Sequence, residues 1–291
     1  MKTTTAVTTI AMILSSFSAN AACPQRTSVA AIGAMSQQLD TTSHQDFRQR
    51  VDRTSDKYQQ LNSIGSISRI PGAAYVGSGF MVSPCLVLTN KHVPFVEVEK
   101  ARKGAQVNFS VGQTGQSSQP FSQSINGSVV DFGGYDGRSS SSSADWALVK
   151  LNKSVVNIQP IPLLQPRWDL LTNAHVITAG FPGNKRADRN DVKDMWGDLD
   201  CQIIGQAEGG FLMHNCQTTH GQSGGPLLSW SKSQNRYFAV GMFSEQYDDG
   251  LSRSMDRGKA NNAISFVSGR DIGFESEGDK ILKAIAANKC D

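Results

Sequence analysis

Ser223 lies in the hexapeptide Gly-Gln-Ser-Gly-Gly-Pro at residues 221–226, whose residue types suit a nucleophile. A serine hydroxyl attacks a carbonyl only weakly at neutral pH, so it needs a nearby base to take its proton. It also needs backbone N–H groups directed at the oxygen that becomes negative during the attack. The flanking glycines permit positive φ and a close approach of substrate. The hexapeptide therefore predicts a catalytic serine loop, with the N–H groups of Gly221 and Ser223 as its oxyanion hole.

The order of residues along the chain restricts where the base can lie. The pattern Gly-x-Ser-x-Gly also occurs in α/β-hydrolases, in which the acid and then the histidine follow the serine. The five histidines here are His44, His92, His175, His214 and His220, and none of them follows Ser223. The α/β-hydrolase order is therefore excluded, and the orders His-Asp-Ser and Asp-His-Ser remain.

Two apolar segments each carry a residue that could complete this chemistry. Residues 86–89, Leu-Val-Leu-Thr, predict a buried strand, and the turn after it delivers His92. Residues 144–151, Ala-Asp-Trp-Ala-Leu-Val-Lys-Leu, predict a strand with Asp145 at its start. Taken singly, such a histidine can be an ordinary satisfied polar group and such an aspartate an ordinary strand terminator. Together they allow a carboxylate to hold a histidine tautomer.

Composition favours a β-rich globular protein. Only 18% of the 291 residues are charged, and 27 are glycine, which is typical of short strands joined by turns. The net charge of +3, from scattered lysines and arginines, gives no reason to expect a nucleic acid partner. The aspartates between residues 188 and 200 fit no calcium-loop spacing, so we expect a solvated loop there and no metal or cofactor.

The N-terminus predicts export. Residues 1–22 combine a basic start at Lys2, a modest apolar stretch and small residues suited to cleavage, as in a secretory signal. No other segment is long and apolar enough to span a membrane. We therefore expect a secreted or periplasmic protein.

Five cysteines would then lie in an oxidising compartment, where disulfides are expected. Cys201 and Cys216 bracket a plausible hairpin and form the first expected pair. Cys85 and Cys290 form the second, which would tie a C-terminal helix at residues 277–289 to the body. Cys23 follows the cleavage site and is left over.

Two other segments bear on the organisation of the chain. Residues 44–61 place apolar side chains at helical spacing, which predicts either an amphipathic helix packed on the body or a pro-segment removed on activation. Residues 112–143 are polar and rich in serine, which predicts an exposed loop.

In this order and context, His92, Asp145 and Ser223 resemble the triad of the chymotrypsin-like, or trypsin-fold, serine proteases. Three blocks carry the resemblance: residues 88–92 (Leu-Thr-Asn-Lys-His), residues 144–151 and the hexapeptide. The turn Ala-Gly-Phe-Pro-Gly at residues 179–183 adds a likeness to the bacterial glutamyl endopeptidase branch. The resemblance implies an all-β fold of two antiparallel six-stranded β-barrels, followed by the C-terminal α-helix. We expect a signal at 1–22, an N-terminal extension at 23–70 and barrels at 71–165 and 166–291.

The same resemblance implies a serine endopeptidase acting on proteins or peptides, which we expect to be a monomer. His92 would be general base and then acid, Asp145 would orient it, and Ser223 would form an acyl-enzyme. The alternative is a relative that kept the fold as a protein-binding module without catalysis. The presence of all three triad residues favours the enzyme, although a fold alone proves no activity.

Some positions depart from the family pattern. Gln222 stands where trypsin-like zymogens carry an aspartate that pairs with a newly cut N-terminus, so that activation switch is missing. Gln217 replaces the pocket aspartate of trypsin, which removes the counter-charge for Lys or Arg side chains. Phe243 falls near the pocket histidine of glutamyl endopeptidases. The resemblance thus implies a mildly polar or apolar pocket. Its expected substrate-binding residues are Gln217, Thr218, Thr219, His220, Phe243 and Ser244.

Overall fold

The computed structural model of the chain describes residues 46–52, 55–69, 76–95, 97, 100–113, 121–134, 144–183, 194–206, 211–245, 261–268 and 275–290. The expected signal at residues 1–22, Cys23 and the serine run at residues 139–143 lie outside these ranges. Within them, no helix is long and apolar enough to cross a membrane.

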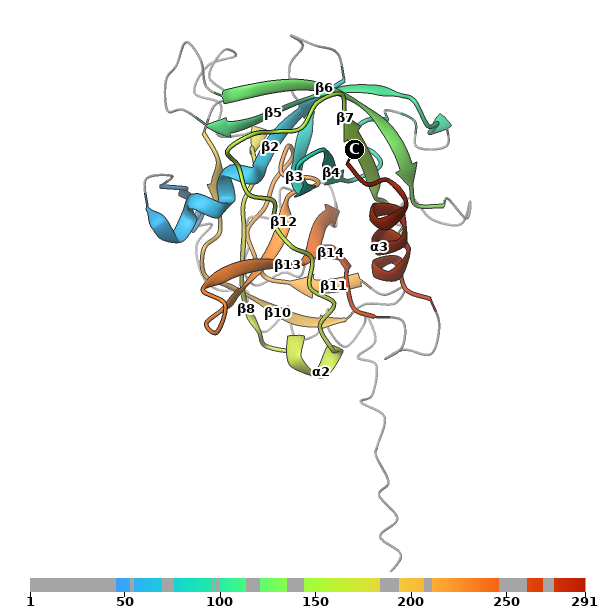
Figure 1. The fold of residues 1–291 in the computed structure, drawn as a ribbon. Coiled ribbons are helices and arrows are strands. Elements are labelled where there is room, and N and C mark those ends of the chain that lie inside the picture. The colour runs from blue at the N-terminus through green and yellow to red at the C-terminus, as the bar shows by residue number, and fades with distance from the viewer. Residues whose placement is uncertain are drawn as a thin grey trace, which may run out of the picture.

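The first of two closed β-barrels follows the order β2-β3-β4-β7-β6-β5 (Figure 1). Its strands are β2 (Ile64–Ser68), β3 (Gly77–Ser83), β4 (Leu86–Thr89), β5 (Gln106–Gln113), β6 (Phe121–Phe132) and β7 (Ala147–Leu151). Neighbouring strands are antiparallel throughout. Because β2 pairs with both β3 and β5, the ring closes and leaves no open strand edge.

The second barrel follows the order β10-β11-β14-β13-β12-β8 and lies below the first in Figure 1. Its strands are β8 (His175–Thr178), β10 (Cys201–Gln206), β11 (Phe211–His214), β12 (Pro226–Ser231), β13 (Arg236–Glu245) and β14 (Asn261–Ser265). A short helix, α2 (Trp168–Leu171), precedes it, and α3 (Glu277–Ala287) follows it. The predicted all-β fold of two six-stranded barrels with a C-terminal helix is confirmed.

Several strands are apolar on both faces because each barrel packs its interior on one side and the other barrel on the other. In β4, Val87 belongs to the core of the first barrel, whereas Leu86 and Leu88 belong to the cluster between the barrels. In β12, Leu227 lies in the core of the second barrel and Leu228 in the shared cluster. The period-2 geometry of a strand therefore turns a continuous apolar run into two separate cores.

Helix α3, near the C-terminus of the chain, packs against the cluster between the two barrels. Ser276 and Asp279 form a reciprocal capping box, which satisfies two of the backbone N–H groups at its first turn. Ile281 is fully buried in the cluster between the barrels. The helix leads to Cys290, whose disulfide with Cys85 reaches back to the first barrel. The predicted terminal helix and this predicted disulfide are both confirmed.

The serine-rich stretch is not the continuous loop that its composition predicted. It contains β6 at Phe121–Phe132 and the end of β5. Ile125, Gly127 and Val129 are buried, whereas Ser124 and Asn126 are exposed. The strand was missed because its outward face is polar and glycine replaces an inward apolar residue, although the period-2 alternation was present.

The N-terminal segment is extended before it becomes helical, which corrects the helix expected across residues 44–61. Strand β1 (Gln49–Arg50) pairs with β9 (Trp196–Gly197), and the helix proper is a 3₁₀ helix, η1 (Asp56–Ser63). Leu61 is nevertheless fully buried, so the apolar spacing did report on core contact. Strand β2 then enters the first barrel ahead of residue 71, where we expected that barrel to begin.

Candidate active site

His92 and Asp145 meet at the ends of two paired strands. His92 follows β4 and Asp145 precedes β7, and these strands pair with Thr89 opposite Ala147. His92 Nδ1 lies 2.7 Å from Asp145 Oδ2, and the His92 backbone N–H donates to Asp145 Oδ1 at 3.0 Å. Both carboxylate oxygens therefore bind the same residue, which fixes the ring orientation. Because Nδ1 binds the carboxylate, Nε2 is the ring atom that can exchange a proton with another group.

Asp145 is held from several sides. Asn90 Nδ2 and the Lys91 N–H donate to its backbone carbonyl, at 2.9 and 3.2 Å. Ser244 Oγ, on β13 of the second barrel, donates to Asp145 Oδ2 at 3.0 Å. The acid is thus anchored both within its own barrel and across the boundary to the other.

Gly224 determines how closely the serine loop approaches the first barrel. Its φ is +84°, and a Cβ there would lie 2.2 Å from the Ser78 carbonyl oxygen and 2.4 Å from Thr89 Oγ1. Only glycine fits this conformation and this contact. The Ser78 N–H, on β3, also donates to the Ser223 carbonyl at 2.8 Å. Backbone contacts therefore join the serine loop to the strands that precede His92.

Gly77 gives a second measure of this proximity. A Cβ at Gly77 would lie 2.5 Å from Val93 Cγ2 and 3.2 Å from the Ser223 carbonyl oxygen. The Ser223 backbone therefore lies close to the residue that follows His92. The structure therefore places the backbone of Ser223 beside the segment in which His92 contacts Asp145, where loops of both barrels meet.

The peptide group between His220 and Gly221 has a defined orientation. The Gly183 N–H donates to the His220 carbonyl at 2.6 Å. In a trans peptide the carbonyl and the next N–H point in opposite directions, so the Gly221 N–H points away from Gly183. Gly221 has φ of +93°, which glycine tolerates at no steric cost. The turn at residues 179–183 thus sets the direction of one N–H group expected in the oxyanion hole.

The expected substrate-binding residues differ in exposure. Gln217, Thr218, Phe243 and Ser244 are buried, Thr219 is half-buried and His220 is exposed. Gln217 Oε1 accepts from the Phe47 N–H at 2.5 Å, so this side chain is engaged with the N-terminal segment.

Phe243 has a neighbour that the sequence did not reveal. The ring of His214, on β11, stands edge-on to it at 6.0 Å, and His214 is fully buried. This contact joins two adjacent regions of the second barrel across β14.

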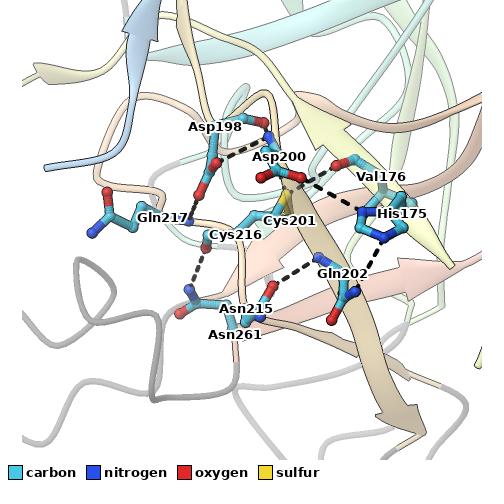
Figure 2. The surroundings of a disulfide bond; sticks show 10 residues. All are labelled: His175, Val176, Asp198, Asp200, Cys201, Gln202, Asn215, Cys216, Gln217 and Asn261. Atoms are coloured by element: carbon cyan, nitrogen blue, oxygen red, sulfur yellow. Dashed lines mark hydrogen bonds and ion pairs between the residues drawn. A yellow bond between two sulfur atoms is a disulfide. The ribbon is translucent and has the colours of Figure 1, made fainter. Parts of the chain in front are cut away.

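The segment before Ser223 starts from a disulfide (Figure 2). Cys201 and Cys216 are bonded, which confirms the first predicted pair. Asp198 accepts from the Gln217 N–H at 3.0 Å and is fully buried. The expectation of a solvated loop is therefore wrong for Asp198, because its carboxylate caps a backbone group next to the disulfide. Asp188 and Asp191 lie outside the described residues.

Arg48 also lies near the serine loop and was not predicted from the sequence. Its side chain has no solvent exposure, and its Nη1 lies 3.4 Å from Gln222 Oε1. The two residues are 174 positions apart. The local pattern around residues 46–51 carries no signal for such a contact.

A metal centre or a surface groove would be a second kind of candidate site in the described residues. Among the described residues, no group of three or more His, Cys, Asp or Glu side chains is arranged to hold a metal ion. A groove of about 880 Å³ lies between η1, residues 157–159 and the turn joining β12 and β13. None of the predicted site residues lines it.

Residues 77–240, more than half of the chain, match the family described as the trypsin-like peptidase domain. The chain belongs to this family. A solved structure of a Glu endopeptidase in complex with MPD matches with a TM-score of 0.55 and 20% sequence identity. The match covers 83% of this chain and 98% of the endopeptidase chain, and at this identity it shows a shared fold alone. No curated protein sequence matches this trypsin-like peptidase significantly.

Membership of the family and the two-barrel fold support a serine protease. The roles of individual residues, the export of the protein and the reaction itself go beyond these matches and are taken up below.

Proposed function

We propose that this trypsin-like peptidase is an exported serine endopeptidase that cleaves peptide bonds through an acyl-enzyme. The observation that carries the proposal is the 2.7 Å contact between His92 Nδ1 and Asp145 Oδ2. This contact lies beside the serine loop, in which the Ser223 carbonyl accepts a hydrogen bond from the Ser78 N–H. These residue types in this arrangement provide a base, an orienting acid and a nucleophile.

In the first step, Ser223 Oγ attacks the substrate carbonyl carbon while its proton passes to His92 Nε2. Asp145 keeps the proton on Nδ1 and stabilises the imidazolium that forms. His92 then gives the proton to the leaving amine, the C–N bond breaks, and the acyl group remains on Ser223. A water molecule, deprotonated by His92, attacks this ester and regenerates the serine.

The negative oxygen formed at each attack would be held by the Gly221 and Ser223 N–H groups. The bond from Gly183 to the His220 carbonyl supports this role, because it directs the Gly221 N–H away from the turn. Removal of one such donor typically costs about 100- to 1,000-fold in kcat. The turn at residues 179–183 would therefore support catalysis without touching substrate.

We further propose that the pocket accepts uncharged side chains. Gln217, Thr218 and Phe243 are buried and carry no formal charge. A charged substrate side chain would be desolvated there without a counter-charge from these residues, which disfavours it. Profiling with a peptide library tests this preference directly.

Export is part of the proposal. Residues 1–22 would be removed as a secretory signal, and residues 23–70 would form the N-terminal extension of the exported protein. The disulfides Cys85–Cys290 and Cys201–Cys216 support an oxidising compartment.

The decisive experiment is labelling of the purified protein with a fluorophosphonate, followed by mass mapping of the adduct. We expect an adduct on Ser223 that disappears in His92→Ala and Ser223→Ala, while circular dichroism shows that both variants stay folded. Ser233→Ala is the matched control, because Ser233 lies in the exposed turn between β12 and β13. Absence of labelling in correctly disulfide-bonded protein would instead favour the protein-binding module.

A further inference from the structure

Residues 46–51, which we call the N-terminal strap, pair through β1 with β9, which lies between β8 and β10 in sequence, although the strap precedes the first barrel. Strand β1 of the strap pairs with β9, Gln49 opposite Gly197. The Val51 N–H donates to the Met195 carbonyl at 2.9 Å. The backbone of the strap is therefore fixed next to residues 195–197 before any of its side chains is considered.

Arg48 projects from this strap into a site with no solvent exposure. Asp46 Oδ1 accepts from Arg48 Nε at 3.0 Å, and Asp46 Oδ2 accepts from Nη2 at 3.1 Å. This two-point pairing provides the counter-charge that a buried guanidinium requires. Burying a charge costs free energy even when the charge is paired. The burial of Arg48 therefore suggests that this side chain has a structural or functional role.

The side chain of Gln222 forms a hydrogen bond with the strap. Its Oε1 accepts from Arg48 Nη1 at 3.4 Å and from the Thr219 N–H at 3.0 Å. Its Nε2 donates to the Trp196 carbonyl at 3.4 Å. The residue immediately before Ser223 is thus tied to the strap, to β9 and to its own loop.

The strap also reaches the other end of the same loop. The Phe47 N–H donates to Gln217 Oε1, while the Gln217 N–H donates to buried Asp198. Residues 217–222 are consequently held at both ends by neighbouring residues of the strap. This loop contains Gly221 and leads into Ser223, the two expected oxyanion donors.

We propose that Arg48 is a positioning residue that holds the serine loop in its catalytic conformation through Gln222. The cation comes from inside the chain, where trypsin-like zymogens use a newly cut N-terminus and an aspartate at the position of Gln222. The site is therefore competent without cleavage of the chain next to the strap, and loss of the strap inactivates it. This inference rests on the proposed function, because it concerns the same serine.

The test compares two arginines of the same strap. Arg50 forms a surface ion pair with Asp194, and its side chain is 57% exposed, so Arg50→Ala is the matched control. We expect Arg48→Ala to lower kcat and the rate of fluorophosphonate labelling by about 100-fold, with little change in KM. Arg50→Ala should stay within about twofold of the unmodified protein. Guanidinium ion at non-denaturing concentration should partly restore Arg48→Ala.

A double-mutant cycle tests the route through Gln222. Gln222→Met keeps the length of the side chain and removes its acceptor. If Arg48 acts through Gln222, the Arg48→Ala/Gln222→Met protein is no slower than the worse single variant. Multiplying effects would overturn this route. Folded Arg48→Ala protein with the unmodified labelling rate would overturn the whole inference.

Two further outcomes remain decisive. If Arg48→Ala fails to fold, Arg48→Lys keeps the charge but loses the two-point pairing, and we expect a reduced rate in folded protein; an undiminished rate contradicts the inference. If the unmodified protein does not label, the proposed function fails separately. Hydrogen exchange then tests the strap, because the amides of Gln222 and Gly224 should exchange faster in Arg48→Ala than in Arg50→Ala; equal rates overturn it.

Discussion

His92 and Asp145 are held within one barrel, at the ends of β4 and β7, whereas Ser223 lies in a loop that several distant segments hold. In the first barrel, strand register places the histidine beside the aspartate, and Ser244 of the second barrel adds one contact to the aspartate. In the second, the loop depends on Ser78 from the first barrel, on Gly183 from the turn before β9 and on the N-terminal strap. The proposed base and acid thus depend mainly on strand pairing, and the proposed nucleophile depends on contacts from several distant segments.

This difference predicts which perturbations stay local. A change at Asp145 should affect chemistry while leaving the barrel intact, because strand pairing continues without the carboxylate. A change in the supports of residues 217–222 should alter stability and reactivity together. Changes at Asp145, at the two disulfides and at Ser244 test this contrast, from the largest expected effect to the smallest.

Asp145→Asn should give the largest loss of activity. An amide in place of the carboxylate keeps the size of the side chain but favours the wrong histidine tautomer, which typically costs about 10,000-fold in kcat. Kinetics with a peptide substrate, together with thermal melting, measure the two effects separately. Asp131→Asn on β6 is the control, since Asp131 forms an ion pair with exposed Lys103. An unchanged kcat in Asp145→Asn would remove the acid from the proposed triad.

The two disulfides can be compared, because Cys201–Cys216 lies in the second barrel and Cys85–Cys290 ties the first barrel to the C-terminal segment. Replacing Cys201 and Cys216 by serine opens a bond of sequence separation 15 and should cost about 3 kcal/mol in free energy of unfolding. Replacing Cys85 and Cys290, of separation 205, should cost about 5 kcal/mol by the same chain-entropy argument. Urea titration measures both.

The rate of fluorophosphonate labelling should rank the two disulfide variants in the reverse order to their loss of stability. Cys216 directly precedes the loop at 217–222, so its loss should slow fluorophosphonate labelling of folded protein. Loss of the Cys85–Cys290 bond should leave the labelling rate unchanged, since that bond ties α3 to the first barrel. Equal labelling rates in the two variants would contradict the proposed dependence of the serine on distant supports.

Ser244→Ala tests the contact that joins the two halves. Its hydroxyl donates to Asp145 Oδ2 at 3.0 Å, and hydrogen bonds to charged groups are worth about 1.5 to 3 kcal/mol. We expect about a tenfold loss in kcat. Ser244→Thr, which keeps the hydroxyl, should recover part of this loss. If alanine has no effect, the acid is held by its own barrel alone.

Tyr237 predicts a weak alkaline dependence of stability. Burial, and secondarily the nearby Tyr58, raises its pKa to about 12 from the usual 10. The folded state therefore keeps the proton in a range where the unfolded chain releases it. The resulting contribution to stability is complete below about pH 10 and is lost as the pH rises towards about 12.

Tyr237→Phe should flatten this part of the pH profile of unfolding free energy. The Tyr237 N–H donates to Gln60 of η1, so this residue lies where the N-terminal segment meets the second barrel. A profile between pH 9 and 11 that is as steep in the phenylalanine variant would place the titrating group elsewhere.

Local sequence was sufficient for the parts of this protein that depend on neighbours in the chain. The strands before His92 and after Asp145 were predicted from short apolar runs, and the hexapeptide around Ser223 from its glycines. Both disulfides were predicted from spacing and position. Strand β6 was missed, although Ile125 and Val129 alternate with polar residues, because serine content outweighed periodicity in the interpretation.

Only the tertiary structure revealed the supports of the serine loop. Asp198 looked like one of several loop acids, yet it is buried against the Gln217 N–H. Arg48 lies in a segment whose structure was predicted from its apolar residues alone, yet it is buried beside Gln222. Such contacts join residues far apart in sequence, and no local period records them. The proposed catalytic residues were thus named from the sequence, whereas the residues that hold the serine loop were found only in the folded structure, where segments far apart in sequence meet.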